Sequence, residues 1–169
     1  MVVLGLTIAG ATASVGIVRA SMADGFTGTT VAVGRFGAID AFNLAIVERQ
    51  TKRGPRKDVW LSSQKTRGES DLYIQSNVWV PGGTTGWHSH PGHSLIIVTA
   101  GTVTAYEADD PACTPHAYTV GMGFVDEGGD HVHVIRNEGS VEARTMTVQL
   151  IPAGATRRVD ADGPSTCPF

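Results

Sequence analysis

Short apolar segments, rich in β-branched and aromatic side chains, alternate with polar, turn-forming segments along most of this chain. Within residues 72–80, alternate positions form one largely aliphatic face and one mixed polar and aromatic face, which is the period of a half-buried β-strand. No helical period persists over three turns beyond residue 23. The pattern predicts strands at residues 29–36, 42–49, 58–63, 72–80, 94–100, 102–107, 116–120, 123–127, 131–137 and 143–151.

Many short strands at regular spacing predict an all-β protein built as a sandwich or a closed barrel. A chain of 169 residues can bury one proper hydrophobic core and is short for two ordinary domains. The composition agrees, because the chain has 21 glycines and only 17% charged residues. We therefore expect a single all-β domain.

The charge pattern argues against a nucleic-acid partner. The net charge is −3, and no segment gathers Lys and Arg densely enough to neutralise a row of phosphates. A small-molecule substrate or ligand is the expected partner.

The N-terminal segment resembles an export signal. An apolar stretch of small residues is followed by Ser-Met-Ala at 21–23, the small-x-small form that signal peptidase prefers. This predicts a leader at 1–23, a domain at 24–169, and an exported protein with no stable membrane span in its mature form. Against it, no Lys or Arg precedes the apolar run and Arg19 follows it. An ordinary N-terminal strand or helix of the fold stays open as the alternative.

The chain has two cysteines, Cys113 and Cys167, and each lies among turn-forming residues. An oxidising compartment lets such a pair persist as a disulfide, here between a loop and the C-terminal tail. The alternative is two unrelated free thiols. Neither cysteine is part of a CxxC pair, so redox catalysis and a structural zinc site have little support.

Three of the six histidines form a pattern typical of a metal site. Residues two apart on a strand project to the same face, so His88 and His90 can direct two imidazoles at one point. His133, on a later strand, can complete a facial triad. Neutral imidazole binds iron, copper, zinc and other first-row metals, and three protein ligands leave positions open for substrate or water.

These histidines also carry a resemblance to the cupin superfamily. Its first motif is Gly, five residues, His-x-His, three or four residues, Glu, six residues, Gly, and every spacing fits between Gly82 and Gly101. Ser94 stands at the glutamate position. The second motif ends in His, three residues, Asn, which His133 and Asn137 match. In amino-acid sequence, the two segments resemble the small exported cupins of actinobacteria with a paired-cysteine tail.

The resemblance implies a single-domain, jelly-roll-like cupin β-barrel with its core at about 70–153. It also implies one divalent transition metal (Fe, Mn, Cu, Zn or Ni) on His88, His90 and His133. The glutamate ligand does not transfer, because the neutral hydroxyl of Ser94 is a poor ligand for a divalent ion. The alternative is a barrel that has lost its metal.

Further residues near these motifs have more than one interpretation each. Ser94 either orients a metal-bound water or substrate, or only fills space. His131 shares the face of His133 by strand parity, so it is an alternate ligand, a proton donor behind the ligands, or part of the cavity mouth. His93 could swing in as a fourth ligand, although its Pro-Gly-His turn favours a solvated side chain.

The residues and the resemblance leave two functions open, from different classes. The first is a metal-dependent enzyme, in particular a non-haem Fe(II) dioxygenase acting on a small molecule, as in some three-histidine members of the superfamily. The second is a non-catalytic exported cupin that binds metal or a small ligand, which the lack of a recognisable base favours. Cupins commonly dimerise, so a homodimer is also expected by analogy of fold.

Overall fold

The structure of this chain is a computed structural model that describes residues 22–167 and 169. The predicted leader lies outside the described residues as far as residue 21. The described residues form twelve strands and no helix, in agreement with the all-β class that the pattern predicts. The strands are β1 (Asp24–Phe36), β2 (Asp40–Thr51), β3 (Gly54–Lys65), β4 (Ser70–Thr84), β5 (His88–Ser89), β6 (Ser94–Ala100), β7 (Thr102–Glu107), β8 (His116–Thr119), β9 (Gly123–Asp126), β10 (His133–Arg136), β11 (Ala143–Pro152) and β12 (Val159–Asp160).

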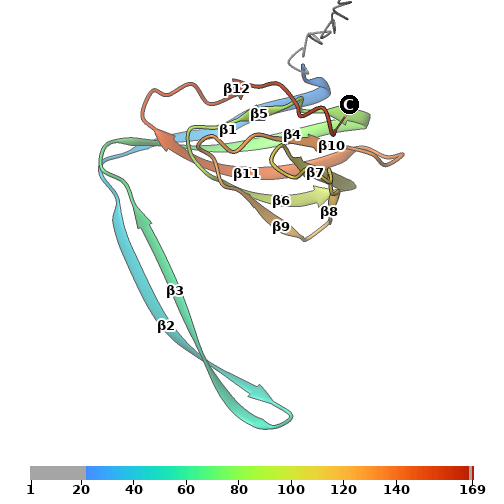
Figure 1. Cartoon of the computed structure of the whole chain (residues 1–169). Helices are drawn as coiled ribbons and strands as arrows, with labels where there is room; N and C mark the ends of the chain where they lie inside the picture. The colour runs from blue at the N-terminus through green and yellow to red at the C-terminus, as the bar shows by residue number, and fades with distance from the viewer. Residues whose placement is uncertain (1–21, 168) are drawn as a thin grey trace, which may run out of the picture.

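Ten of these strands form a nearly closed antiparallel barrel, which confirms the predicted all-β barrel (Figure 1). The long strand β4 pairs with β1 and with β11 over most of its length, and β10 meets its end. On one side the sheet continues from β11 to β6 and β9. On the other, β10 pairs with β5 and β7, β5 with β12, and β7 with β8.

The face of β4 that points into the barrel is not the aliphatic one. The mixed polar and aromatic face points inward, since Trp79 and Asn77 are buried while Val80 is 49% exposed. Inside the barrel, Trp79 packs against the ring of Phe26, with 4.9 Å between the ring centroids. Gln75, Asn77 and Trp79 of this face line a cavity inside the barrel.

The predicted disulfide is present between Cys113 and Cys167, with 5.5 Å between their Cα atoms. Cys167 is buried in a small apolar cluster with Trp87, Tyr106 and Val134. The bond therefore fixes the C-terminal segment against the outside of the barrel, where it has few strand hydrogen bonds of its own. This is the location that the turn-rich surroundings of both cysteines predict.

Strands β2 and β3 form the segment that departs most from expectation. They pair with each other from Asp40↔Lys65 to Thr51↔Gly54 and make a separate two-stranded sheet. This hairpin, called here the arm, projects away from the barrel (Figure 1). Ile39 and Thr66 close its base, because each backbone N–H donates to the other residue. The strands are as predicted, but they add nothing to the barrel.

Candidate metal centre

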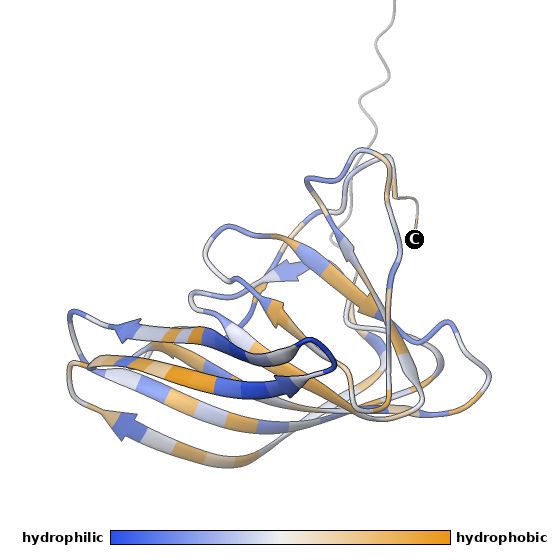
Figure 2. Ribbon diagram, turned by 90° about the horizontal axis from the view of Figure 1, so that it is seen from below, coloured by the Kyte–Doolittle hydropathy of each residue, from blue (hydrophilic) through white to orange (hydrophobic). Residues whose placement is uncertain are grey.

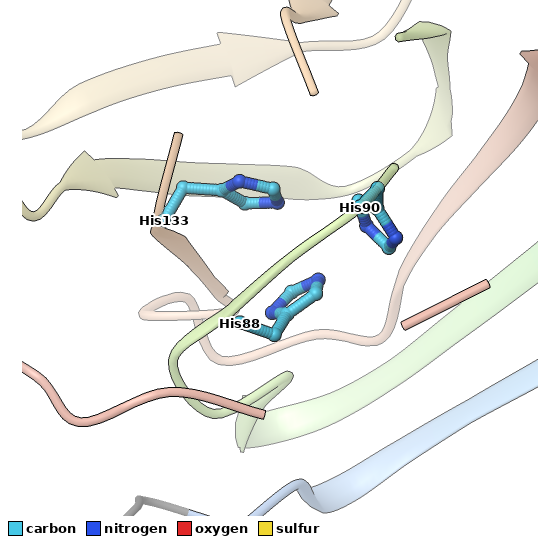
Figure 3. A group of neighbouring side chains, drawn as sticks. All are labelled: His88, His90 and His133. Atoms are coloured by element: carbon cyan, nitrogen blue, oxygen red, sulfur yellow. The ribbon is translucent and has the colours of Figure 1, made fainter. Parts of the chain in front are cut away.

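The three histidines of the sequence pattern point toward one another (Figure 3), and all three line the barrel cavity. His88 lies on β5 and is the cross-strand partner of His133 on β10, while His90 follows β5 directly. One ring nitrogen from each histidine lies within 4.8 Å of the others. His88 and His133 are buried and His90 is half-buried. The antiparallel pairing of β5 with β10 thus brings together residues 45 positions apart.

Backbone carbonyl groups orient two of the rings. The Nδ1 atom of His88 lies 2.8 Å from the carbonyl oxygen of Gly86, and that of His90 lies 2.5 Å from the carbonyl oxygen of Arg157. When Nδ1 donates its proton to a carbonyl, the lone pair stays on Nε2. Both rings therefore present Nε2 as the ligand atom.

Burial keeps the rings in the form that a metal requires. It lowers the pKa of His88 to about 2 and that of His133 to about 4, because the charged imidazolium is poorly solvated there. Neighbouring histidines lower the pKa of His88 further. Both rings are therefore neutral at physiological pH, and a neutral imidazole is the metal-binding species. This donor set fits a divalent transition metal.

Ser94 lies beside the histidines and is fully buried. It pairs across strands with Asp126, the last residue of β9, and its hydroxyl donates to Asp126 Oδ2 at 3.1 Å. Asp126 lies 3.6 Å from both the His90 Nε2 and the His133 Nδ1 atoms. The sequence pattern did not single out this carboxylate, because only the register of β6 with β9 places it opposite the motif serine.

The cavity beyond the histidines is small and most of the residues that line it are polar. It encloses about 180 Å³, which suits a molecule of few heavy atoms. Three buried atoms on its wall have no hydrogen-bond partner among the described residues: the Asn77 Oδ1 acceptor, the Trp79 Nε1 donor and His133 Nδ1. The polar residues that line the cavity with them are Gln75, Thr85, Thr145, Thr147, Gln149, Arg157 and Arg158.

Arg157 has a fixed position on the cavity wall. Its guanidinium lies over the ring of Tyr73, 4.0 Å from the centroid, and donates to Gln149 at 3.0 Å and to Gln75. The backbone carbonyl of Arg157 also contacts His90. Arg157 therefore both orients a candidate metal ligand and places a cation in the cavity. A fixed guanidinium of this kind favours an anionic group on the ligand.

The other predicted residues lie in different surroundings. His131 lies 3.4 Å from Glu107 and forms with Glu107 and His133 a second group whose ligand atoms could hold an ion. It is therefore adjacent to the triad without lining the cavity. His93 lines a separate hollow with Ser70 and Ile151 on the outside of the barrel. The structure thus brings Ser94 to the triad and leaves His93 away from it.

Comparisons with known proteins concern the arrangement of strands. No family model matches the sequence, and no curated protein matches it. Among solved structures, a cupin-like protein from Thermotoga maritima has 22% identity and a TM-score of 0.45, covering 54% of this chain and 65% of that one. A protein from Klebsiella pneumoniae with a double-stranded β-helix domain has 17% identity and a TM-score of 0.45 over 54% of this chain and 75% of that one. An oxalate oxidase has 20% identity and a TM-score of 0.41 over 48% and 46%.

The matched region is about half of this chain in each case, and the chain spans less than half of the oxalate oxidase. Likeness at this level identifies no reaction.

Proposed function

We propose that this protein is an exported cupin that holds one divalent transition metal on His88, His90 and His133 and binds a small polar molecule beside it. The observation that carries the proposal is the convergence of three imidazoles, two of them held neutral by burial, on one point of a polar cavity. Uncharged buried rings repel one another little and gain from a shared cation. Three protein ligands leave positions open for a further ligand.

We infer that the protein is an enzyme, and that its reaction is a non-haem Fe(II) dioxygenation. Bound at the triad, iron would supply a Lewis acid and a redox partner for dioxygen. The chain itself positions the substrate: Arg157 attracts an anionic group, and the Asn77 and Trp79 side chains offer one acceptor and one donor.

One observation favours a non-catalytic alternative, a cupin that captures metal or a small ligand without converting it. Asp126 is the carboxylate among the residues that line the cavity. Both of its oxygens already accept hydrogen bonds, Oδ2 from Ser94 and Oδ1 from the Gly128 N–H. A general base is expected to be freer to accept a proton.

Export is the remaining element of the proposal. The disulfide is consistent with an oxidising compartment. Within the described residues there is no helix of the length and hydropathy that a membrane span needs. The N-terminal sequence of the mature protein, determined after expression in an actinobacterial host, tests export directly. Cleavage after residue 23 supports it, and retention of the leader in the cytoplasm contradicts it.

Metal analysis of the purified protein tests the central claim. We expect near-stoichiometric metal by elemental mass spectrometry in the wild type and none in a His88→Ala, His133→Ala double variant. The exposed His116 gives the control, since His116→Ala should keep the full metal content. Iron in the wild type, with oxygen consumption that starts on addition of a small carboxylate, supports the dioxygenase. Tightly held metal without turnover supports the binding protein, and absence of metal from the wild type contradicts both.

A further inference from the structure

Asp126 lies opposite Ser94, the residue at the glutamate position of the cupin motif, and borders the group of His88, His90 and His133. The motif glutamate is absent, and the Ser94 hydroxyl at that position donates instead to Asp126 on the neighbouring strand. Asp126 is 5% exposed. The hydrogen bonds from Ser94 and from the Gly128 N–H leave one lone-pair direction on each oxygen, and His90 and His133 lie at 3.6 Å.

No Lys or Arg among the described residues forms a salt bridge with this carboxylate. The charged or ring nitrogens within 4 Å of it belong to His90 and His133, and the His133 ring is neutral at physiological pH. A buried carboxylate without a counter-charge is strongly unfavourable, whereas a divalent ion at the triad would neutralise it. Carboxylate oxygens are also ordinary ligands for iron, manganese and zinc.

We infer that Asp126 is the fourth protein ligand of the metal centre and that Ser94 is the residue that positions it. The carboxylate that the motif would place on β6 is thereby supplied by Asp126, the residue opposite Ser94 on the neighbouring strand β9. The inference rests on the proposed metal site and adds a ligand to it.

Metal affinity and the spectrum of a bound probe test this assignment. Co²⁺ is added to the metal-free protein, its visible absorption is recorded, and its affinity is measured by competition with a chelator. Asp126→Asn should bind Co²⁺ at least about tenfold more weakly than the wild type and with a changed spectrum, because the ligand charge is lost. Glu127→Gln removes the same charge from the exposed neighbouring residue and should change neither.

A rescue variant separates a ligand from a residue that only orients a histidine. Adding Ser94→Glu to Asp126→Asn returns a carboxylate to the motif position and should restore affinity to within a few-fold of the wild type. Equal affinity and spectra for Asp126→Asn and wild type would overturn the assignment while leaving the three-histidine site intact. A larger loss in Glu107→Gln than in Asp126→Asn would also overturn it, by placing the ion at the His131 group. Failure of the wild type to bind Co²⁺ would instead contradict the metal site itself.

A second inference concerns the arm and rests on independent observations. Opposite residues of an antiparallel pair share a face, so the pairs Leu44↔Leu61 and Ile46↔Val59 lie side by side. Together with Phe42 they form one apolar face, called here the arm face. All five side chains are between 54% and 69% exposed. An isolated two-stranded hairpin is at best marginally stable in water, so this face requires a cover.

A matching apolar surface lies on the outside of the barrel. Val148, Leu95 and Val125 form one row across β11, β6 and β9, and Ile97 follows on the same face. These four residues, called here the outer patch, are between 38% and 58% exposed. The chain's own arm therefore leaves the outer patch uncovered. Figure 2 shows apolar bands along the arm and along the sheet, with the hydrophilic end of the arm away from its base.

Charge indicates which occupant fits both surfaces. The arm has six Lys or Arg against three Asp or Glu, a net charge of +3. The rest of the chain has seven against thirteen, a net charge of −6. A basic arm is thus complementary to the acidic remainder of a second copy, and a two-fold arrangement covers both apolar surfaces of both copies at once.

We propose that two copies of this chain form a dimer in which the arm face of each packs on the outer patch of the other. Sedimentation velocity over a range of concentrations tests it. A Leu44→Asp, Ile46→Asp variant and a Leu95→Asp, Ile97→Asp variant should each dimerise at least about 100-fold more weakly, because charges enter the centre of the interface. Asn43→Asp, on the opposite face of the arm, should associate like the wild type.

Mixing the two weakened variants identifies the geometry. The first variant keeps its outer patch and the second keeps its arm face. These two surfaces can still pack together, so a heterodimer should form although neither variant dimerises alone. A dimeric Leu95→Asp, Ile97→Asp variant would overturn the proposal in favour of arm-to-arm contact. A wild type that stays monomeric would overturn it too, and flotation of that monomer with anionic vesicles would assign the arm to a membrane. If a charged variant fails to fold, joining Ile39 to Thr66 by a short Gly-Ser turn removes the arm and should give a folded monomer.

Discussion

The barrel and the arm are both antiparallel β-structure, but they distribute polar and apolar side chains in opposite ways. In the barrel, Asn77, Thr145 and Gln149 are buried, and strands on several sides hold them in place. Asn77 Nδ2, for example, donates to the hydroxyls of Thr145 and Thr147. In the arm, aliphatic side chains are exposed and each strand has one neighbour.

The two regions therefore depend on different interactions for their stability. A buried polar wall is stable when its groups are hydrogen-bonded, and the barrel supplies those partners from within the molecule. An exposed apolar face gains free energy only when another surface removes it from water. The interior of the barrel is thus complete in a single chain apart from the contents of its cavity, whereas the arm face and the outer patch depend on what they contact.

Substituting one tryptophan in each region tests this contrast most strongly. Trp79 is 1% exposed inside the barrel, and Trp60 is 55% exposed on the arm, on the face opposite the arm face. Trp79→Ala should lower the free energy of unfolding by about 3–5 kcal/mol, because it leaves a cavity in the core. Trp60→Ala should change it by less than about 0.5 kcal/mol. Urea titration of the two variants measures both, and equal losses would contradict the division into two regions.

Removing the disulfide should lower the free energy of unfolding by less than Trp79→Ala does, and only in the barrel. Cys113 and Cys167 close a loop with a sequence separation of 54 residues. A Cys113→Ser, Cys167→Ser variant should lose about 2–4 kcal/mol of unfolding free energy, because the unfolded chain becomes freer. Hydrogen exchange of the arm amides should stay as in the wild type, since the two arm strands pair with each other and not with the barrel. Faster exchange in the arm would show that the two regions unfold together.

The sequence supported the barrel better than the arm for a physical reason. Strand periodicity is local, so the segments at 42–49 and 58–63 could be predicted as strands, but the pattern is the same for a barrel strand and a free hairpin. The convergence of His88, His90 and His133 could be predicted from the sequence, because strand parity and the motif spacing limit where they can lie. The place of Asp126 could not be predicted, because its contact with Ser94 spans 32 residues and depends on strand register.

The histidines of the barrel predict a pH dependence that the arm lacks. In the folded, metal-free protein burial holds the pKa of His88 at about 2 and that of His133 at about 4, whereas both titrate near 6.5 when unfolded. Between pH 6.5 and about 4 the unfolded chain therefore binds protons that the folded chain does not. The free energy of unfolding should fall as pH falls, by up to about 1.4 kcal/mol per pH unit for each histidine.

Removing one of these rings isolates its contribution. His88→Ala should show a shallower loss of stability than the wild type over this pH range, and His116→Ala, an exposed histidine, should follow the wild type. Denaturant titrations at several pH values in the presence of a chelator provide the measurement. Parallel curves for His88→Ala and wild type would mean that burial does not lower the pKa of this ring in the folded protein.

The smallest difference between the regions is expected for two ion pairs. At the base of the arm, Lys65 Nζ lies 2.7 Å from Asp40, and both side chains are largely exposed. In the barrel, the Arg35 guanidinium donates to both oxygens of Asp71, at 2.8 Å and 2.9 Å, and the Gly154 N–H donates to the same carboxylate. Asp71 is buried, and these hydrogen bonds lower its pKa.

Lys65→Ala should therefore change the free energy of unfolding by less than about 0.5 kcal/mol, because water and salt screen an exposed pair. Arg35→Ala should cost more, since it leaves a buried carboxylate without its cation. Urea titrations at low and high salt should show the larger loss for Arg35→Ala at both concentrations. The opposite order would mean that the base of the arm is held as firmly as the barrel, and that the arm is a rigid part of the single chain before any second surface covers it.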